Sequence, residues 1–130
     1  MGIVFISYSK AKDLKGEAKM NLDIKHSLES TNHEVVHLIG EIDAFTAPKL
    51  KETLFPLVEK EGLVVKVDLS EVNYIDSTGL GIFVGAYKSS HNSNSKLQLI
   101  GLNERVYRLF SITGLDEIID IVPEKKEGAR

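Results

Sequence analysis

The distribution of apolar residues predicts strands and helices that alternate along most of the chain. Short apolar or alternating segments bounded by turn-forming residues are typical of strands. The predicted strands comprise residues 22–28, 34–42, 63–69, 96–102 and 117–122. The third of these is a run of leucine and valine broken only by Lys66 and Asp68, which is typical of a mostly buried strand.

Three segments show the apolar spacing of amphipathic helices. The first comprises residues 46–60, with Pro48 in its first turn. The second, residues 80–87, has apolar side chains at positions i, i+3, i+4 and i+7. The third begins after the capping residue Asn103 and ends near Gly114. The apolar positions of the three helices are Leu50, Leu54, Leu57 and Val58; Leu80, Phe83, Val84 and Tyr87; and Val106, Leu109 and Phe110.

This order of elements predicts an α/β fold, with a central mixed and largely parallel sheet covered by helices. We expect one domain over residues 20–122 and a charged tail over residues 123–130. Residues 1–19 carry a net charge of +2, whereas the other 111 residues carry −5. We therefore expect residues 1–19 to be an extension, either a tag or a leader. The alternative is a first edge strand at residues 3–8.

The composition narrows the classes of function. The chain of 130 residues has no cysteine, which excludes disulfides and thiolate metal sites. Its 16 basic and 19 acidic residues give a net charge of −3, so it lacks the positive field that direct binding of nucleic acid requires. No apolar run approaches the roughly 20 residues of a membrane span. We expect a cytoplasmic protein that does not bind a membrane.

The segment that leads into the second helix contains the most distinctive residues. Asp76, Ser77 and Thr78 are three successive residues that can cap a helix, although one is sufficient. If Ser77 is the cap, Thr78 lies one residue inside the helix. Gly79 and Gly81 leave the opening face of the helix without side chains, and a bare helix start can be approached closely by an anion or by another protein. The simpler interpretation is a capped helix whose glycines permit close packing.

Catalytic motifs are not evident at this segment. Ser77 lacks the Gly-x-Ser-x-Gly context of a hydrolase nucleophile, and no histidine has a spacing that marks it as a base. Gly79 and Gly81 resemble the start of a dinucleotide-binding fingerprint, but Val84 stands where the third glycine belongs. The segment that begins at Ser77 also follows its predicted strand only after a seven-residue connection, rather than immediately. We expect no catalytic residues, no cofactor and no metal ligands.

A second stretch, residues 40–45, contains Gly-Glu-Ile-Asp and connects a strand to the first helix. By itself it indicates only an acidic turn in which Asp43 or Thr46 caps the helix.

Taken together, these stretches resemble the STAS family, and more closely the bacterial anti-anti-sigma factors of the RsbV type. The resemblance covers residues 20 to about 122 and rests on residues 40–43, 74–85 and 105–115. The element Asp-Ser-x-Gly-Leu-Gly at Asp76–Gly81 is its most specific part.

The resemblance implies a switch protein of the general stress type, rather than an enzyme. Its serine, here Ser77, is expected to be phosphorylated by an anti-sigma factor that is also a serine kinase. The unphosphorylated form would bind that anti-sigma factor and free a sigma factor, and a metal-dependent Ser/Thr phosphatase would reset the switch. The residues expected to bind the partner are Asp43, Asp76, Ser77, Thr78, Gly79, Leu80 and Gly81.

Two other kinds of function remain open at this point. The chain could be another STAS module, such as a stressosome-type scaffold subunit or a domain detached from a transporter. It could also be an enzyme that uses Ser77 as a nucleophile. The oligomeric state and the sigma factor concerned are not indicated.

Overall fold

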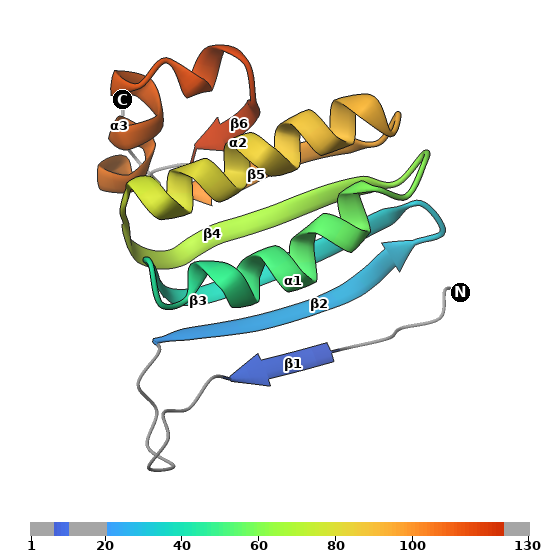
Figure 1. The fold of residues 1–130 in the computed structure, drawn as a ribbon, viewed down its shortest axis with the longest axis horizontal. Helices are drawn as coiled ribbons and strands as arrows, with labels where there is room; N and C mark the ends of the chain where they lie inside the picture. The colour runs from blue at the N-terminus through green and yellow to red at the C-terminus, as the bar shows by residue number, and fades with distance from the viewer. Residues whose placement is uncertain (1–6, 11–20, 124–130) are drawn as a thin grey trace, which may run out of the picture.

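A computed structural model describes residues 7–10 and 21–123 of the chain. Six strands form one sheet in the order β1-β2-β3-β4-β5-β6 (Figure 1). β1, β2 and β3 are antiparallel neighbours, whereas β3, β4, β5 and β6 are parallel. The sheet is therefore mixed and mostly parallel, as the sequence predicts. The strands are β1 (Ser7–Lys10), β2 (Leu22–Ser30), β3 (His33–Ile42), β4 (Val64–Ile75), β5 (Lys96–Leu102) and β6 (Asp120–Pro123).

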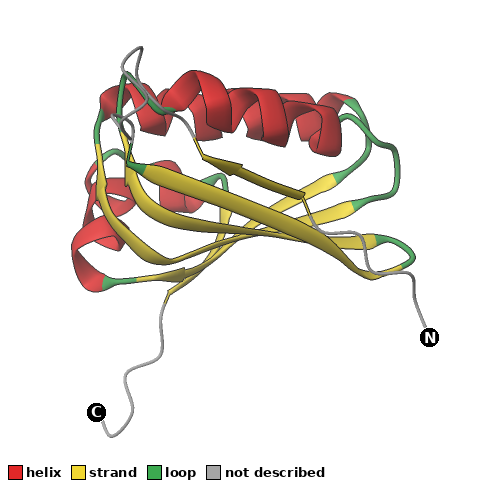
Figure 2. Ribbon diagram, turned by 90° about the horizontal axis from the view of Figure 1, so that it is seen from below, coloured by secondary structure: helices red, strands yellow, loops and turns green. Residues whose placement is uncertain are grey.

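Two long helices cover one face of this sheet. Helix α1 (Ala47–Val58) and helix α2 (Ser77–Asn92) lie side by side over the sheet, and the opposite face of β2 and β3 is covered by no helix of the described residues (Figures 1 and 2). The two helices approach closely where Phe55 lies over Gly85, since a Cβ atom on that glycine would be 3.0 Å from the ring. Parallel strands need crossover connections, and α1 and α2 provide two of them.

Helix α3 (Glu104–Ile112) packs at the carboxyl ends of β4 and β5 and leads into a short 3-10 turn, η1 (Leu115–Glu117). Asn103 caps α3, as predicted, because its side chain accepts a hydrogen bond from the Val106 amide at 2.9 Å. The same side chain donates to the carbonyl of Val72 in β4 at 3.1 Å. This residue therefore fixes the start of α3 against the sheet.

The core lies between the sheet and the helices. The apolar positions predicted for α1 are buried, and α3 contributes Val106 and Phe110. The buried face of α2 differs from the prediction, because Phe83 is buried whereas Leu80, Val84 and Tyr87 are partly exposed. Glycine, alanine and serine fill the rest of that face, so the α2 helix approaches the sheet closely. Its buried residues are Gly79, Phe83, Ala86 and Ser90.

Two strand boundaries differ from the prediction by three residues or more, and helix α2 is longer at both ends than the predicted residues 80–87. β4 extends to Ile75, six residues beyond the predicted end, so the connection to α2 is a single residue rather than seven. The apolar pattern did not predict this extension, because most residues in the second half of β4 are polar and exposed and only Val72 and Ile75 are buried there. The last strand begins at Asp120 because η1 occupies the start of the predicted segment.

The amino-terminal segment contributes a strand. β1 pairs antiparallel with β2 from Ser7 opposite His26 to Lys10 opposite Asp23. This strand overlaps the alternative expected at residues 3–8, of which residues 3–6 lie outside the described part. The limits of the domain at 20 and 122 stay a prediction.

Candidate functional site

The two stretches singled out in the sequence meet at the carboxyl ends of β3 and β4. Ile42 and Ile75 are register partners in this parallel pair, so the residues that follow them, Asp43 and Asp76, emerge side by side. The amide of Asp76 donates a hydrogen bond to the carbonyl of Ile42 at 3.1 Å, which ties the two connections together. One surface thus combines the β3–α1 loop with the start of α2.

The β3–α1 loop is held by a compact set of hydrogen bonds. The Asp43 carboxylate accepts from the amides of Phe45 at 2.9 Å and Thr46 at 3.0 Å. The Thr46 hydroxyl accepts from the Asp43 amide at 2.8 Å and donates to the Glu41 carbonyl at 3.0 Å. Thr46 is the residue before α1, but its side chain makes no capping bond within the helix. Asp43 therefore organises the loop while staying partly exposed.

At the start of α2, Asp76 is the cap. Its carboxylate accepts a hydrogen bond from the Gly79 amide at 3.1 Å, which satisfies one of the free donors of the first turn. Of the three possible caps in the sequence, Ser77 is not the one used, since it is already the first helical residue. Asp76 takes that position because β4 continues to the residue before it.

Ser77 and Thr78 are both exposed on the first turn of α2. Within the described part of the chain, neither hydroxyl has a hydrogen-bond partner. Ser77 is the nearer of the two to the amino end of the helix, where the amides and the helix dipole favour negative charge.

The two glycines of the first turn differ in their surroundings. Gly79 is buried, and a Cβ atom there would lie 2.6 Å from Cγ2 of Ile42 and 2.8 Å from Cγ1 of Ile75. Gly81 is exposed, and a Cβ atom there would meet nothing within 4 Å. Of the residues expected to bind a partner, Gly79 thus lies under the surface and Gly81 lies on it. Leu80 is partly buried and packs against the core.

Two aromatic residues that are not among the site residues predicted from the sequence border this surface. Phe45, in the β3–α1 loop, is 74% exposed, and Tyr74, at the end of β4, is 48% exposed. Exposed aromatic side chains are enriched at protein interfaces. Each had a signal in the sequence, because Phe45 is a large apolar residue in a predicted turn and Tyr74 directly precedes the Ile-Asp-Ser-Thr-Gly segment. We name the surface formed by Asp43, Phe45, Tyr74, Asp76, Ser77, Thr78 and Gly81 the switch surface.

Neither a membrane-spanning helix nor a metal site is found among the described residues. No helix among them has the length and apolar character needed to cross a membrane. No group of three or more His, Asp or Glu side chains in the described part of the chain is arranged to hold a metal ion.

Comparison with known proteins places the chain in a family. The sequence model of the STAS domain matches residues 26–128. The chain belongs to the STAS domain family. The α/β fold of a single STAS domain and the resemblance predicted from the sequence are both confirmed.

Relatives of this STAS protein carry a consistent name. It is 53% identical over 102 residues to the anti-sigma-B factor antagonist of Listeria monocytogenes, covering 78% of this chain and 90% of that protein. It is 43% identical over 111 residues to the anti-sigma-B factor antagonist of Bacillus subtilis, covering 85% of this chain and 98% of that protein.

Its fold is also that of SpoIIAA, an anti-sigma factor antagonist. The unphosphorylated form aligns with a TM-score of 0.66 at 15% identity, over 80% of this chain and 90% of the other. The phosphorylated form aligns with a TM-score of 0.63 at 14% identity, over 80% of this chain and 93% of the other.

Proposed function

We propose that this STAS protein is an anti-anti-sigma factor that works by binding. Its unphosphorylated form binds an anti-sigma factor through the switch surface and thereby releases a sigma factor. The anti-sigma factor is also a serine kinase, which phosphorylates Ser77 and ends the interaction, and a metal-dependent Ser/Thr phosphatase restores the active form. Since sigma factors act on transcription, this function implies a cytoplasmic protein.

The observation that carries the proposal is the position of Ser77. Its hydroxyl is exposed and unbonded at the first residue of α2, between Asp76 and the exposed Thr78, with Asp43 on the neighbouring connection. A kinase can therefore reach it without unfolding any part of the domain. The names of the relatives, which are 53% and 43% identical, support a role as an antagonist of an anti-sigma factor.

The electrostatics of the switch surface suit such a modification. A phosphate on Ser77 would add a charge of about −1.5 to −2 to a chain whose net charge is −3. At the amino end of α2 this charge is favoured by the helix dipole, so the fold tolerates it. In a closed interface, this charge would be repelled by the carboxylates of Asp43 and Asp76 and would lose its hydration. The modification therefore opposes binding without opposing folding.

The surroundings of Ser77 also favour a phosphate acceptor over a nucleophile. A catalytic serine needs a general base within hydrogen-bond distance, oriented by a further group. Nothing in the described part of the chain hydrogen-bonds the Ser77 hydroxyl. A fluorophosphonate probe tests this distinction, since we expect no labelling of Ser77.

The experiment that tests the proposal uses the cognate anti-sigma factor, co-purified from the host. Titration calorimetry measures its affinity for the unmodified chain, and peptide mapping after incubation with ATP locates the phosphate. We expect a complex, a single phosphate on Ser77, and loss of the complex after modification. Absence of a complex, or a phosphate mainly on Thr78, would contradict the proposed switch.

A further inference from the structure

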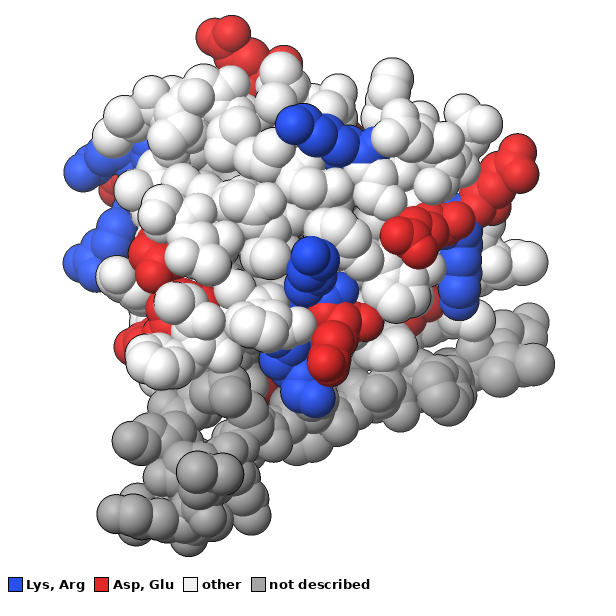
Figure 3. Space-filling view, viewed as in Figure 1, with Lys and Arg blue, Asp and Glu red and all other residues white. Residues whose placement is uncertain are grey.

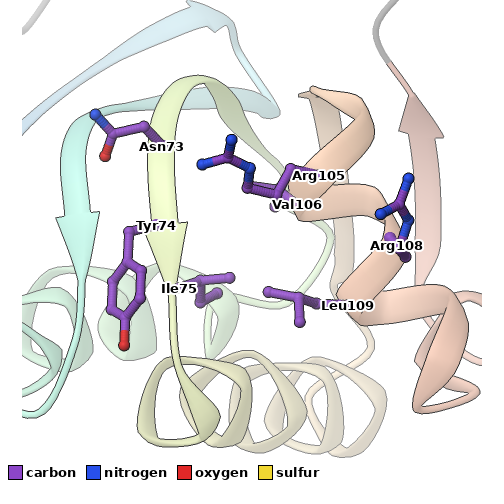
Figure 4. A pocket seen from close by; sticks show the side chains of 7 residues that line it. All are labelled: Asn73, Tyr74, Ile75, Arg105, Val106, Arg108 and Leu109. Atoms are coloured by element: carbon purple, nitrogen blue, oxygen red, sulfur yellow. The ribbon is translucent and has the colours of Figure 1, made fainter.

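A groove lies between the end of β4 and helix α3, adjacent to the switch surface. It has a volume of about 320 Å³, and Figure 4 shows Ile75 and Leu109 facing one another across it. Its floor is apolar, because Ile75 and Val106 are buried and Leu109 packs against the core. Arg105 and Arg108 stand on its α3 side.

The geometry of α3 explains why cationic groups border this groove. Asn103 fixes the start of the helix on β4, and Val106 and Phe110 point into the core. Arg105 and Arg108 lie about 100° or more from these two residues on the helical wheel, and both are consequently exposed. The arginines are thus held at the rim by a helix that is anchored at its first turn.

Neither arginine has a partner among the residues that the structure describes. Several other cations of the domain are paired, such as Lys66 with Glu29 at 3.6 Å and Lys96 with Asp120 at 3.9 Å. Two unpaired guanidinium groups therefore stand beside an apolar floor on this acidic chain. A guanidinium group binds a carboxylate through two parallel hydrogen bonds.

The groove is continuous with the switch surface. Tyr74 lines the groove and belongs to that surface, and Ile75 connects it directly to Asp76. The two regions have opposite charge, since carboxylates flank Ser77 whereas guanidinium groups border the groove. Figure 3 shows acidic and basic side chains close together on the side where α3 and the start of α2 lie, at the left of the view. This polarity would allow a partner with complementary charges to dock in one orientation.

We propose that the groove binds an acidic segment of the anti-sigma factor, with an apolar side chain seated between Ile75 and Leu109 and carboxylates paired with Arg105 and Arg108. This inference rests on the proposed function and adds a second contact region to it. Charge complementarity indicates the chemistry of the occupant. The unpaired guanidinium groups would pair with anions, and the apolar floor of the groove would bind an apolar side chain. The volume is sufficient for one or two side chains rather than for a large cofactor.

Interface energetics agree with this assignment. Tyrosine and arginine are, with tryptophan, the residue types enriched at binding hot spots, which cluster in well-packed pockets. Tyr74, Arg105 and Arg108 have that arrangement around the groove. A partner segment seated here would also bring its neighbouring residues over Ser77, so the groove would help to position the kinase.

The test compares two double charge reversals that change the net charge equally. The first is Arg105→Glu with Arg108→Glu, in the groove. The control is Lys60→Glu with Lys88→Glu, which changes two exposed lysines near the carboxyl ends of α1 and α2. Lys88 lies eleven residues into α2 from Ser77, which places it about 16 Å along the helix.

Affinity for the purified anti-sigma factor is measured by calorimetry at two salt concentrations, with thermal melting as a check of folding. We expect the groove variant to bind at least about tenfold more weakly, with a smaller dependence on salt, and the control to bind like the parent. The milder pair Arg105→Gln with Arg108→Gln is expected to give an intermediate loss.

The outcomes separate this inference from the proposed function. If the parent binds the anti-sigma factor and the folded groove variants bind equally well, the groove is not part of the interface, although the proposed function stands. If both double reversals weaken binding equally, the effect is one of net charge and the groove assignment is wrong. If the parent itself does not bind, both proposals fail.

Discussion

A methyl group on Gly79 would lie 2.6 Å from Cγ2 of Ile42, closer than side-chain carbons approach one another. Ile42 is fully buried at the end of β3, so it has no free space into which to move. The absence of a side chain at position 79 is therefore what lets α2 begin directly on the sheet.

We expect Gly79→Ala to destabilise the fold by about 1–3 kcal/mol, the usual cost of overpacking a filled core. Gly81→Ala is the matched control, because a Cβ atom there meets nothing within 4 Å. It should be neutral or stabilising by up to about 1 kcal/mol, since alanine favours a helix over glycine. Urea unfolding of both variants measures the difference. Equal stability of the two would mean that α2 can shift away from Ile42 at little cost.

The second prediction concerns the cap of α2. Asp76→Ala removes the acceptor of the Gly79 amide and should cost about 1 kcal/mol of unfolding free energy, whereas Asp76→Asn should retain most of the stability. Ser77→Ala removes no capping bond and should stay within about 0.5 kcal/mol of the parent. Chemical denaturation of the three variants tests the assignment. A larger loss for Ser77→Ala than for Asp76→Ala would contradict it.

The third prediction separates charge from folding at Ser77. Ser77→Asp places a carboxylate at the first residue of α2, where the helix dipole should stabilise it by about 0.3–1 kcal/mol. Its binding to the anti-sigma factor should weaken by about 1–3 kcal/mol, because the added charge would be buried next to Asp43 and Asp76. Ser77→Ala should bind like the parent. Melting temperature and affinity are measured on the same samples.

A result in which Ser77→Asp binds tightly and Ser77→Ala fails to bind would argue against the charge mechanism. The serine hydroxyl would then be a direct contact. Since a carboxylate has about half the charge of a phosphate, the phosphorylated parent should bind more weakly than Ser77→Asp.

The fourth prediction concerns the amino-terminal segment. Deletion of residues 1–19 removes β1 and uncovers the edge of β2. Each backbone hydrogen bond contributes about 0.5–1.5 kcal/mol, whereas ordering each residue costs about 1–2 kcal/mol. For a strand of four residues we therefore expect a loss of less than about 2 kcal/mol and no change in partner affinity. Denaturant unfolding checks this, with deletion of residues 1–6 as the control. A larger loss would make β1 an integral part of the domain.

The order of the elements from β2 onward follows from local patterns in the chain. The apolar spacing in residues 46–60 predicted α1 because only one face of a surface helix is buried, and that requirement leaves a periodic signal. The same holds for β2 and β3, whose alternating residues face the core or the solvent. The motif around Ser77 also indicated the family, since it depends on neighbouring residues only.

Which residues share a surface depends on the packing of segments that are far apart in the chain. The parallel register of Ile42 with Ile75 brings Asp43 next to Asp76, and register arises from contacts between distant segments. The different roles of Gly79 and Gly81 likewise depend on what lies beneath the helix. The groove beside α3 lies between α3 and β4, which are separate in the chain, so no local pattern could predict it. Local sequence preferences determine the individual helices and strands, whereas contacts between distant segments determine which residues form a site.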